Sequence, residues 1–312
     1  MDRPHDRCEG NRVSADITRP DDADEFSFLP AQAAALGSEV PAARRVQLPL
    51  PDGRTLSALR FGDEAPRVVL LHGAGLNAHT FDATVLSLGE PALAIDLPGH
   101  GDSSWRDDAA YLPAVLAPDV ILGIEAWAAS PVVLVGQSLG GATAAAVAAA
   151  RPDLVAALVL VDITPGIDGT GPSQLRRFYE RLSFASRDEL LDYVLSFGLG
   201  GDREQARRGI VLNSRVLPDG TVEWKHHFAR IAAGALAPET RTPGDWSDLE
   251  AVTAPITLVR GTLGFVSPDA VADFRARLPH AEIVELHAPH NVQEVAPEGL
   301  ATVIRSQSAR VR

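Results

Sequence analysis

The stretch "VVLVGQSLGG" (residues 132–141) decides the fold, because it predicts a strand, a sharp turn and a helix in succession. The valine-rich start has high strand propensity, and the alanine-rich segment after the turn has high helix propensity. Ser138 lies between Gly136 and Gly140, and glycines are needed where side chains would collide across a tight turn. The pattern therefore indicates an accessible serine that can act as a nucleophile. The alternative is a structural glycine-rich turn with an idle serine.

Apolar runs of strand length recur along the chain, and segments with helical periodicity separate most of them. The runs lie at residues 67–73, 91–99, 131–138, 157–163, 255–261 and 281–287, and the helical segments at 78–89, 111–129, 139–151 and 267–279. Continuous Val, Ile and Leu runs are typical of strands buried on both faces of a parallel sheet. We therefore expect the α/β fold class, with a mostly parallel open sheet and helices on both faces. The turn signal Pro51-Asp52-Gly53 predicts a hairpin over residues 46–62.

The same texture divides the chain into four parts. Residues 1–42 are acidic and have little periodicity, which predicts a mobile N-terminal extension with a short helix near residues 29–39. Residues 43–164 and 251–312 are expected to form the two parts of the core. Residues 165–250 lack a strong buried-strand signal and contain helical segments, which predicts a helical cap. A cap at the carboxyl edge of a sheet can cover a ligand crevice.

Composition excludes several classes of partner. The net charge of −13 argues against nucleic acid and anionic membranes, because both bind basic faces. Cys8 is the single cysteine, so an intrachain disulfide is impossible and nothing indicates a metal-thiolate site. The charged start has no apolar leader, and the longest apolar stretch is interrupted by Arg151, Pro152 and Asp153. We expect a soluble cytoplasmic protein without membrane insertion, and the oligomeric state is left open.

Four motifs in order resemble those of the α/β-hydrolase superfamily. They are "LLHGAGLNAHTF" (70–81), "AIDLPGHGDSS" (94–104), "VGQSLGG" (135–141) and "APHNVQEVAP" (288–297). The resemblance runs from about residue 44 to the end and is closest to bacterial serine ester hydrolases with a helical cap. It implies an α/β-hydrolase fold, with the cap inserted after the sixth strand. It also implies an oxyanion hole formed by the backbone N–H groups of Leu139 and Ala74, with Ser138 as the nucleophile.

A serine nucleophile needs a base, and the chain has nine histidines. His290 follows the last predicted strand, as the order serine, acid, histidine requires. His72 is expected to hold the oxyanion loop. The remaining candidates are expected to be structural, to belong to a strand end or to lie in the cap: His100, His287, His226 and His227.

The acid that orients the histidine is missing from its usual place in this superfamily, the loop after "PITLVRG", where this chain has Gly264 and Phe265. Asp162 lies at a predicted strand tip, 24 residues after Ser138. Strand tips on that edge converge on the crevice. Some haloalkane dehalogenases of the superfamily place their acid on this strand. Asp162 is therefore the predicted third member, and Asp269, near a helix start, is the rival.

The resemblance implies a serine hydrolase that cleaves carboxylic esters of small to medium apolar substrates through an acyl-enzyme, without metal or organic cofactor. Gly73, Gln137 and Phe265 are predicted to lie near the substrate. Cap aromatics either line the pocket or form the cap's own core: Phe178, Tyr179, Phe184, Tyr193, Phe197 and Trp224. Alternatives are hydrolysis of a C–C bond, a lactone or a thioester. Gly264 in place of the usual acid favours another alternative, a catalytically silent binding protein.

Overall fold

The computed structural model describes residues 24–166, 177–234 and 246–310. Its main sheet has eight strands in the order β1-β2-β4-β3-β5-β6-β10-β11. The antiparallel hairpin of β1 and β2 joins β4 at one edge, and the other neighbouring pairs are parallel. The strands are β1 (Ala43–Pro49), β2 (Thr55–Phe61), β3 (Val68–Leu71), β4 (Ala92–Asp96), β5 (Val132–Gln137), β6 (Val155–Val161), β10 (Ile256–Gly261) and β11 (Glu282–Leu286). The predicted α/β class and mostly parallel sheet are confirmed.

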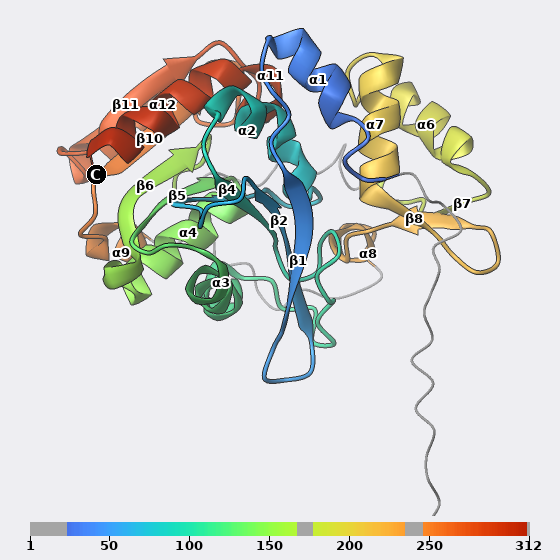
Figure 1. Cartoon of the computed structure of the whole chain (residues 1–312), viewed down its shortest axis with the longest axis horizontal. Coiled ribbons are helices and arrows are strands. Elements are labelled where there is room, and N and C mark those ends of the chain that lie inside the picture. Colours follow the sequence, from blue (N-terminus) through green and yellow to red (C-terminus); the bar gives the residue numbers. More distant parts are fainter. Residues whose placement is uncertain (1–23, 167–176, 235–245, 311–312) are drawn as a thin grey trace, which may run out of the picture.

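Helices cover both faces of this sheet (Figure 1). One face carries α1 (Leu29–Leu36), α2 (Asp82–Leu88) and α12 (Pro297–Arg310). The other carries α3 (Pro113–Trp127), α4 (Leu139–Ala150), α9 (Trp246–Ala251) and α10 (Pro268–Arg277). The short elements η1 (Ala78–Phe81), η2 (Pro152–Leu154) and α11 (Val292–Val295) join these layers. Central strands β3, β4 and β5 are buried along their whole length, which explains their continuous apolar sequences.

The chain between β6 and β10 includes a cap with its own apolar core. The sequence left open whether six aromatic residues, from Phe178 to Trp224, line the pocket or form the cap's own core. In the structure all six pack against one another in this core. The cap elements are β7 (Ser183–Phe184), α6 (Arg187–Ser196), α7 (Arg203–Asn213), β8 (Ser214–Val216), β9 (Val222–Trp224) and α8 (Phe228–Ala232). They lie to the right of the sheet in Figure 1.

The cap differs from the helical cap that the sequence predicts, because β7, β9 and β8 form a three-stranded antiparallel sheet. The turn Pro218-Asp219-Gly220 joins β8 to β9, and the Leu217 N–H donates to the Thr221 carbonyl at 2.7 Å. Helix α9 stands at the C-terminal end of the predicted cap, but its Leu249 packs against the core helix α4 rather than into the cap core. Residues 167–176 and 235–245, which belong to the predicted cap, lie outside the described residues.

The structure also differs from the mobile extension predicted over residues 1–42. Residues 1–23 lie outside the described part, but residues 24–42 pack against the core. Leu29 and Ala33 of α1 are 1% and 2% exposed. One acidic side chain of this segment is paired with the core: Glu25 forms an ion pair with Arg45 of β1 at 2.6 Å.

Arg45 connects three parts of the molecule. Its guanidinium also pairs with buried Asp96 at the end of β4 (2.6 Å) and with Asp102 (3.1 Å). Asp102 in turn pairs with Lys225, which follows β9 of the cap, at 3.3 Å. The N-terminal segment, the sheet and the cap are therefore joined by one network of charges. None of the helices in the described part of the chain has the length and apolar character needed to cross a membrane.

His79 of η1 extends this network on the other side of Glu25. Its ring nitrogens lie 3.0 Å from Asp82 and 3.3 Å from Glu25, and Arg208 of the cap reaches Asp82 at 2.8 Å. Burial alone would lower the pKa of His79, but the Asp82 and Glu25 carboxylates outweigh burial and raise that pKa to about 9. The imidazole is therefore expected to be charged at neutral pH.

This pKa predicts a specific dependence of stability on pH. The pKa is raised above the value of about 6.5 for an unfolded chain, so the stabilisation is complete below about pH 6.5 and is lost as pH rises through about 9. We expect the wild type to lose on the order of 1–3 kcal/mol between pH 6.5 and 9.5 through this group. Thermal denaturation of the wild type and of His79→Gln from pH 6 to 10 measures it. The gap between the two Tm values should shrink as pH rises from about 6.5 and be smallest above about pH 9, and a constant gap would contradict the assignment.

Candidate active site

The sharp turn between β5 and α4 places Ser138 at the carboxyl edge of the sheet. Its backbone has φ 52° and ψ −120°, a strained conformation for a residue with a side chain. A Cβ on Gly136 would overlap the backbone of Gly140, and one on Gly140 would overlap the backbone at the end of β3. Glycines are therefore required here, as the sequence predicts. The Ser138 N–H donates to the Val161 carbonyl at 3.2 Å, which ties the turn to β6.

Asp162, directly after β6, has a fully buried carboxylate with three hydrogen-bond donors. The Gly261 N–H donates to Oδ1 at 3.1 Å, and the Phe265 N–H donates to Oδ2 at 2.7 Å. His290 Nδ1 lies 2.8 Å from the same Oδ2. An ionised carboxylate accepts only, so Nδ1 carries a ring proton, and in the neutral imidazole Nε2 then keeps its lone pair. The three bonds offset the cost of burying the charge.

His290 lies in the loop after β11, and its side chain is 19% exposed. Gln137, next to Ser138, donates from Nε2 to the His290 carbonyl at 3.2 Å, which brings the histidine loop beside the turn. Within the described residues, the Ser138 hydroxyl and His290 are not hydrogen-bonded to each other. Catalytic hydrogen bonds are often long before a substrate aligns the groups. The structure thus pairs His290 with Asp162 and places both at the edge that carries Ser138.

The surroundings of Gly264, in the loop after β10, explain how a glycine can stand where the family resemblance led us to expect an acid. A Cβ on Gly264 would overlap the Asp162 carboxylate. A larger residue at this position and the carboxylate of Asp162 therefore cannot occupy the same space. The rival Asp269 is exposed in the first turn of α10. The sequence alternative in which Asp162 supplies the acid is the one that this geometry supports.

The two predicted oxyanion donors belong to two segments that meet at Ser138. Leu139 is the first residue of α4, where a helix provides no acceptor for the N–H. Ala74 lies between Gly73 and Gly75, and a Cβ on Gly73 would lie 3.2 Å from the Ser138 Cβ, so the loop passes close to Ser138. A loop N–H and a helix N-terminus at the same serine are suited to stabilise a developing negative charge.

His72 holds this loop, as expected from the sequence. Its Nε2 accepts a hydrogen bond from the Leu97 N–H at 3.0 Å, and its Nδ1 donates to the Gly73 carbonyl at 2.8 Å. Burial lowers the pKa of His72, so the ring stays neutral. His287 lies at the end of β11, and its Nδ1 is 3.2 Å from the hydroxyl oxygen of Thr262.

The cap contacts the loop that carries Ala74, and the sequence analysis did not predict this contact. Asn213, at the end of α7, donates to the Gly75 carbonyl at 2.7 Å. A Cβ on Gly75 would lie 2.9 Å from the Tyr179 hydroxyl and 3.8 Å from the His226 ring. The glycine that admits these side chains is visible in the sequence, but its cap partners lie more than 100 residues away.

The three residues predicted to lie near the substrate have different surroundings. Gln137 is 1% exposed and donates to the histidine loop, and Gly73 is buried against the Gln137 side chain. Phe265 is 57% exposed, and its ring stacks on the His290 imidazole. Their contact with substrate stays a prediction. In the described ranges, no group of three or more His, Cys, Asp or Glu side chains is arranged to hold a metal ion.

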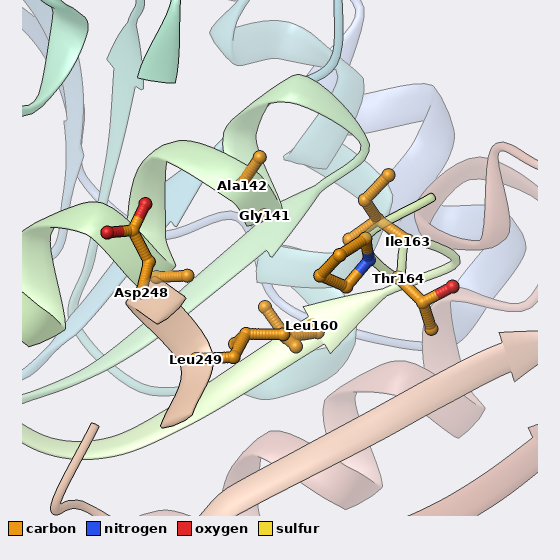
Figure 2. Close-up of a pocket in the computed structure, with 9 residues that line it drawn as sticks. Gly141, Ala142, Leu160, Ile163, Thr164, Asp248 and Leu249 are labelled. Carbon is orange, nitrogen blue, oxygen red and sulfur yellow. The ribbon is translucent and has the colours of Figure 1, made fainter. Parts of the chain in front are cut away.

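An apolar pocket lies beside the site, between α4, the end of β6 and α9 (Figure 2). Its lining includes neither Ser138 nor His290, although its residues Ile163 and Thr164 directly follow Asp162. The labelled lining residues are Gly141, Ala142, Leu160, Ile163, Thr164, Asp248 and Leu249. The pocket therefore adjoins the site rather than containing the nucleophile.

The fold and the sharp turn define a class of protein that an independent comparison also finds. A sequence model of the alpha/beta hydrolase family matches residues 68–303. The chain belongs to this family.

Individual relatives are more specific. The chain is 38% identical to esterase Rv0045c of Mycobacterium tuberculosis, over 90% of this chain and 95% of that one. A solved structure of that esterase covers 93% of this chain and 100% of its own, with a TM-score of 0.78. The chain is also 30% identical to lipase LipV of the same organism, over 81% of this chain and 97% of that one. A 2-(acetamidomethylene)succinate hydrolase of Mesorhizobium japonicum is 29% identical over 85% of this chain and 95% of its own.

Gly264→Ala tests the space that the loop leaves for the carboxylate. The added Cβ overlaps Asp162 and must displace it or the loop, so we expect kcat to fall by roughly tenfold or more. The matched control is Gly209→Ala in α7, where a Cβ meets no atom within 4 Å. Steady-state kinetics on a chromogenic ester compares the two variants. Unchanged kcat in Gly264→Ala would show that the overlap has no consequence.

Asp162→Asn tests the acid itself. An amide cannot accept from all three N–H donors, so the imidazole loses its fixed tautomer, and we expect kcat to fall about 10²- to 10⁴-fold. Asp269→Asn, at an exposed position, should keep the wild-type rate. Circular dichroism checks that both variants fold. Equal activity of Asp162→Asn and wild type would remove Asp162 from the site.

Proposed function

We propose that this chain is a serine hydrolase that cleaves carboxylic esters through an acyl-enzyme intermediate, with Ser138, His290 and Asp162 as its triad. One observation carries the proposal: the buried Asp162 carboxylate lies 2.8 Å from His290 Nδ1, at the sheet edge where Ser138 stands. This arrangement leaves Nε2 available as a base. The likeness to an esterase and a lipase supports an ester as the bond that is cleaved.

The proposed reaction begins when His290 Nε2 takes the proton of the Ser138 hydroxyl, whose oxygen attacks the ester carbonyl carbon. The carbonyl oxygen becomes negative and accepts hydrogen bonds from the N–H groups of Leu139 and Ala74. The intermediate collapses when the carbon–oxygen bond to the alcohol breaks, and Nε2–H gives its proton to the leaving oxygen. Water, activated by the same nitrogen, then hydrolyses the acyl-enzyme and restores Ser138. Asp162 holds the imidazole tautomer and stabilises the imidazolium in both halves.

The proposed substrate is a small to medium apolar ester. Support comes from the adjoining pocket of Figure 2, which is lined mainly by apolar side chains. The cap aromatics give no support, because they pack in the cap's own core. A cytoplasmic location, predicted from the sequence, stays a prediction.

The alternatives differ in how far the geometry supports them. A silent binding protein was favoured by the missing acid at Gly264, and the contact between Asp162 and His290 removes that reason. Hydrolysis of a C–C bond, a lactone or a thioester uses the same residues, so the bond that is cleaved must be determined with a panel of substrates.

Ser138→Ala tests the proposed function. The wild type should hydrolyse p-nitrophenyl esters of short and medium acyl chains, and the variant should lose at least about 10³-fold in kcat. Ser196→Ala, an exposed serine of the cap helix α6, is the matched control and should keep full activity. A small phosphonate should add covalently to the wild type and not to Ser138→Ala, as measured by intact-protein mass. Absence of turnover and of labelling in the wild type would sink the proposal.

A further inference from the structure

Phe265 has an unusual position for a phenylalanine in this chain. Its ring is 57% exposed, whereas Phe61, Phe81, Phe184 and Phe274 are almost fully buried. The ring stacks on the imidazole of His290, with the centroids 4.0 Å apart and the planes inclined by 18°. An exposed ring contributes little to the hydrophobic core, and among the described residues the aromatic ring that it stacks on is the His290 imidazole.

The hydrogen bond to Asp162 does not fix the imidazole by itself. It holds the position of His290 Nδ1, but the ring plane can still turn about the line between Nδ1 and the Cβ attachment. Such a rotation changes the direction in which Nε2 points. A flat ring stacked at 4.0 Å opposes the rotation, because any tilt of the imidazole collides with it. The hydrogen bond fixes the position of Nδ1, and the stacked ring fixes the plane of the imidazole.

The backbone of Phe265 contacts the other partner of the histidine. Its N–H donates to Asp162 Oδ2, the same oxygen that accepts from His290 Nδ1. Gly264 lets the chain approach the carboxylate closely enough for this bond. One residue thus positions the acid through its backbone and the imidazole through its ring.

We propose that Phe265 is a positioning residue for the reaction: its ring fixes the plane of the His290 imidazole, and with it the direction of Nε2, the proposed base for Ser138. The ring face also lies against the imidazolium that forms when the base takes a proton, and a cation over an aromatic face is attracted to it. The proposal rests on the proposed serine hydrolase function. It goes beyond that function because a triad needs only the serine, the base and the acid.

The test separates kcat from KM. Phe265→Leu keeps an apolar side chain but removes the flat ring, and we expect kcat for a p-nitrophenyl ester to fall about tenfold with KM within about twofold of the wild type. Phe265→Tyr keeps the ring, and its hydroxyl can point to solvent from an exposed position, so it should restore kcat to within about twofold. The second-order rate of labelling by a small phosphonate should fall with kcat in Phe265→Leu, because labelling uses the same base.

Leu263→Ala is the control for a general loss of apolar surface, since Leu263 lies two residues away in the same loop and is 63% exposed. It should leave kcat unchanged. A raised KM with unchanged kcat in Phe265→Leu would overturn the proposal in favour of a substrate contact. Equal loss of kcat in the Leu and Tyr variants would overturn it too. If the wild type hydrolyses no ester, the proposed function fails first, whereas an active wild type with an equally active Phe265→Leu refutes the positioning role alone.

Discussion

The site depends on the buried carboxylate of Asp162 and its three N–H partners. Each partner lies on a different segment: Gly261 ends β10, Phe265 follows it in the loop, and His290 follows β11. The charge is fully shielded from solvent, so all three donors are needed to compensate for the lost hydration. The carboxylate therefore sets the mutual position of three chain segments as well as the orientation of one ring.

The parallel sheet explains how this carboxylate can stand on β6. Strands β6 and β10 are neighbours, and the Asp162 N–H donates to the Val259 carbonyl at 2.8 Å. Adjacent strands lie about 4.8 Å apart, and parallel strands end on the same edge. A carboxylate at either strand end can thus reach a histidine above the edge, provided that the other loop leaves room. Gly264 provides that room, so adjacency in the sheet matters more than order in the sequence.

Local signals made much of this predictable. Glycine spacing around Ser138, apolar strand runs and the position of Asp162 at a strand tip each depend on a few neighbouring residues. The stack of Phe265 on His290 could not be predicted, because no local pattern sets a ring plane across two loops. The small cap sheet was not predicted, because its strands have only two or three residues, too few for an alternation of apolar and polar side chains to show. Its one local signal is the turn Pro218-Asp219-Gly220. The packing of residues 24–42 depends on Arg45 and His79, which the acidic composition does not reveal.

The hydrogen bond from Asn213 to the Gly75 carbonyl joins the cap to the loop beside Ser138. Asn213 is the last residue of the cap helix α7. Gly75 follows Ala74, whose N–H is proposed to donate a hydrogen bond to the negatively charged oxygen. The position of the loop that carries Ala74 therefore depends on a cap residue as well as on the sheet. A change at Asn213 can reach the proposed charge-stabilising groups without altering Ser138, His290 or Asp162.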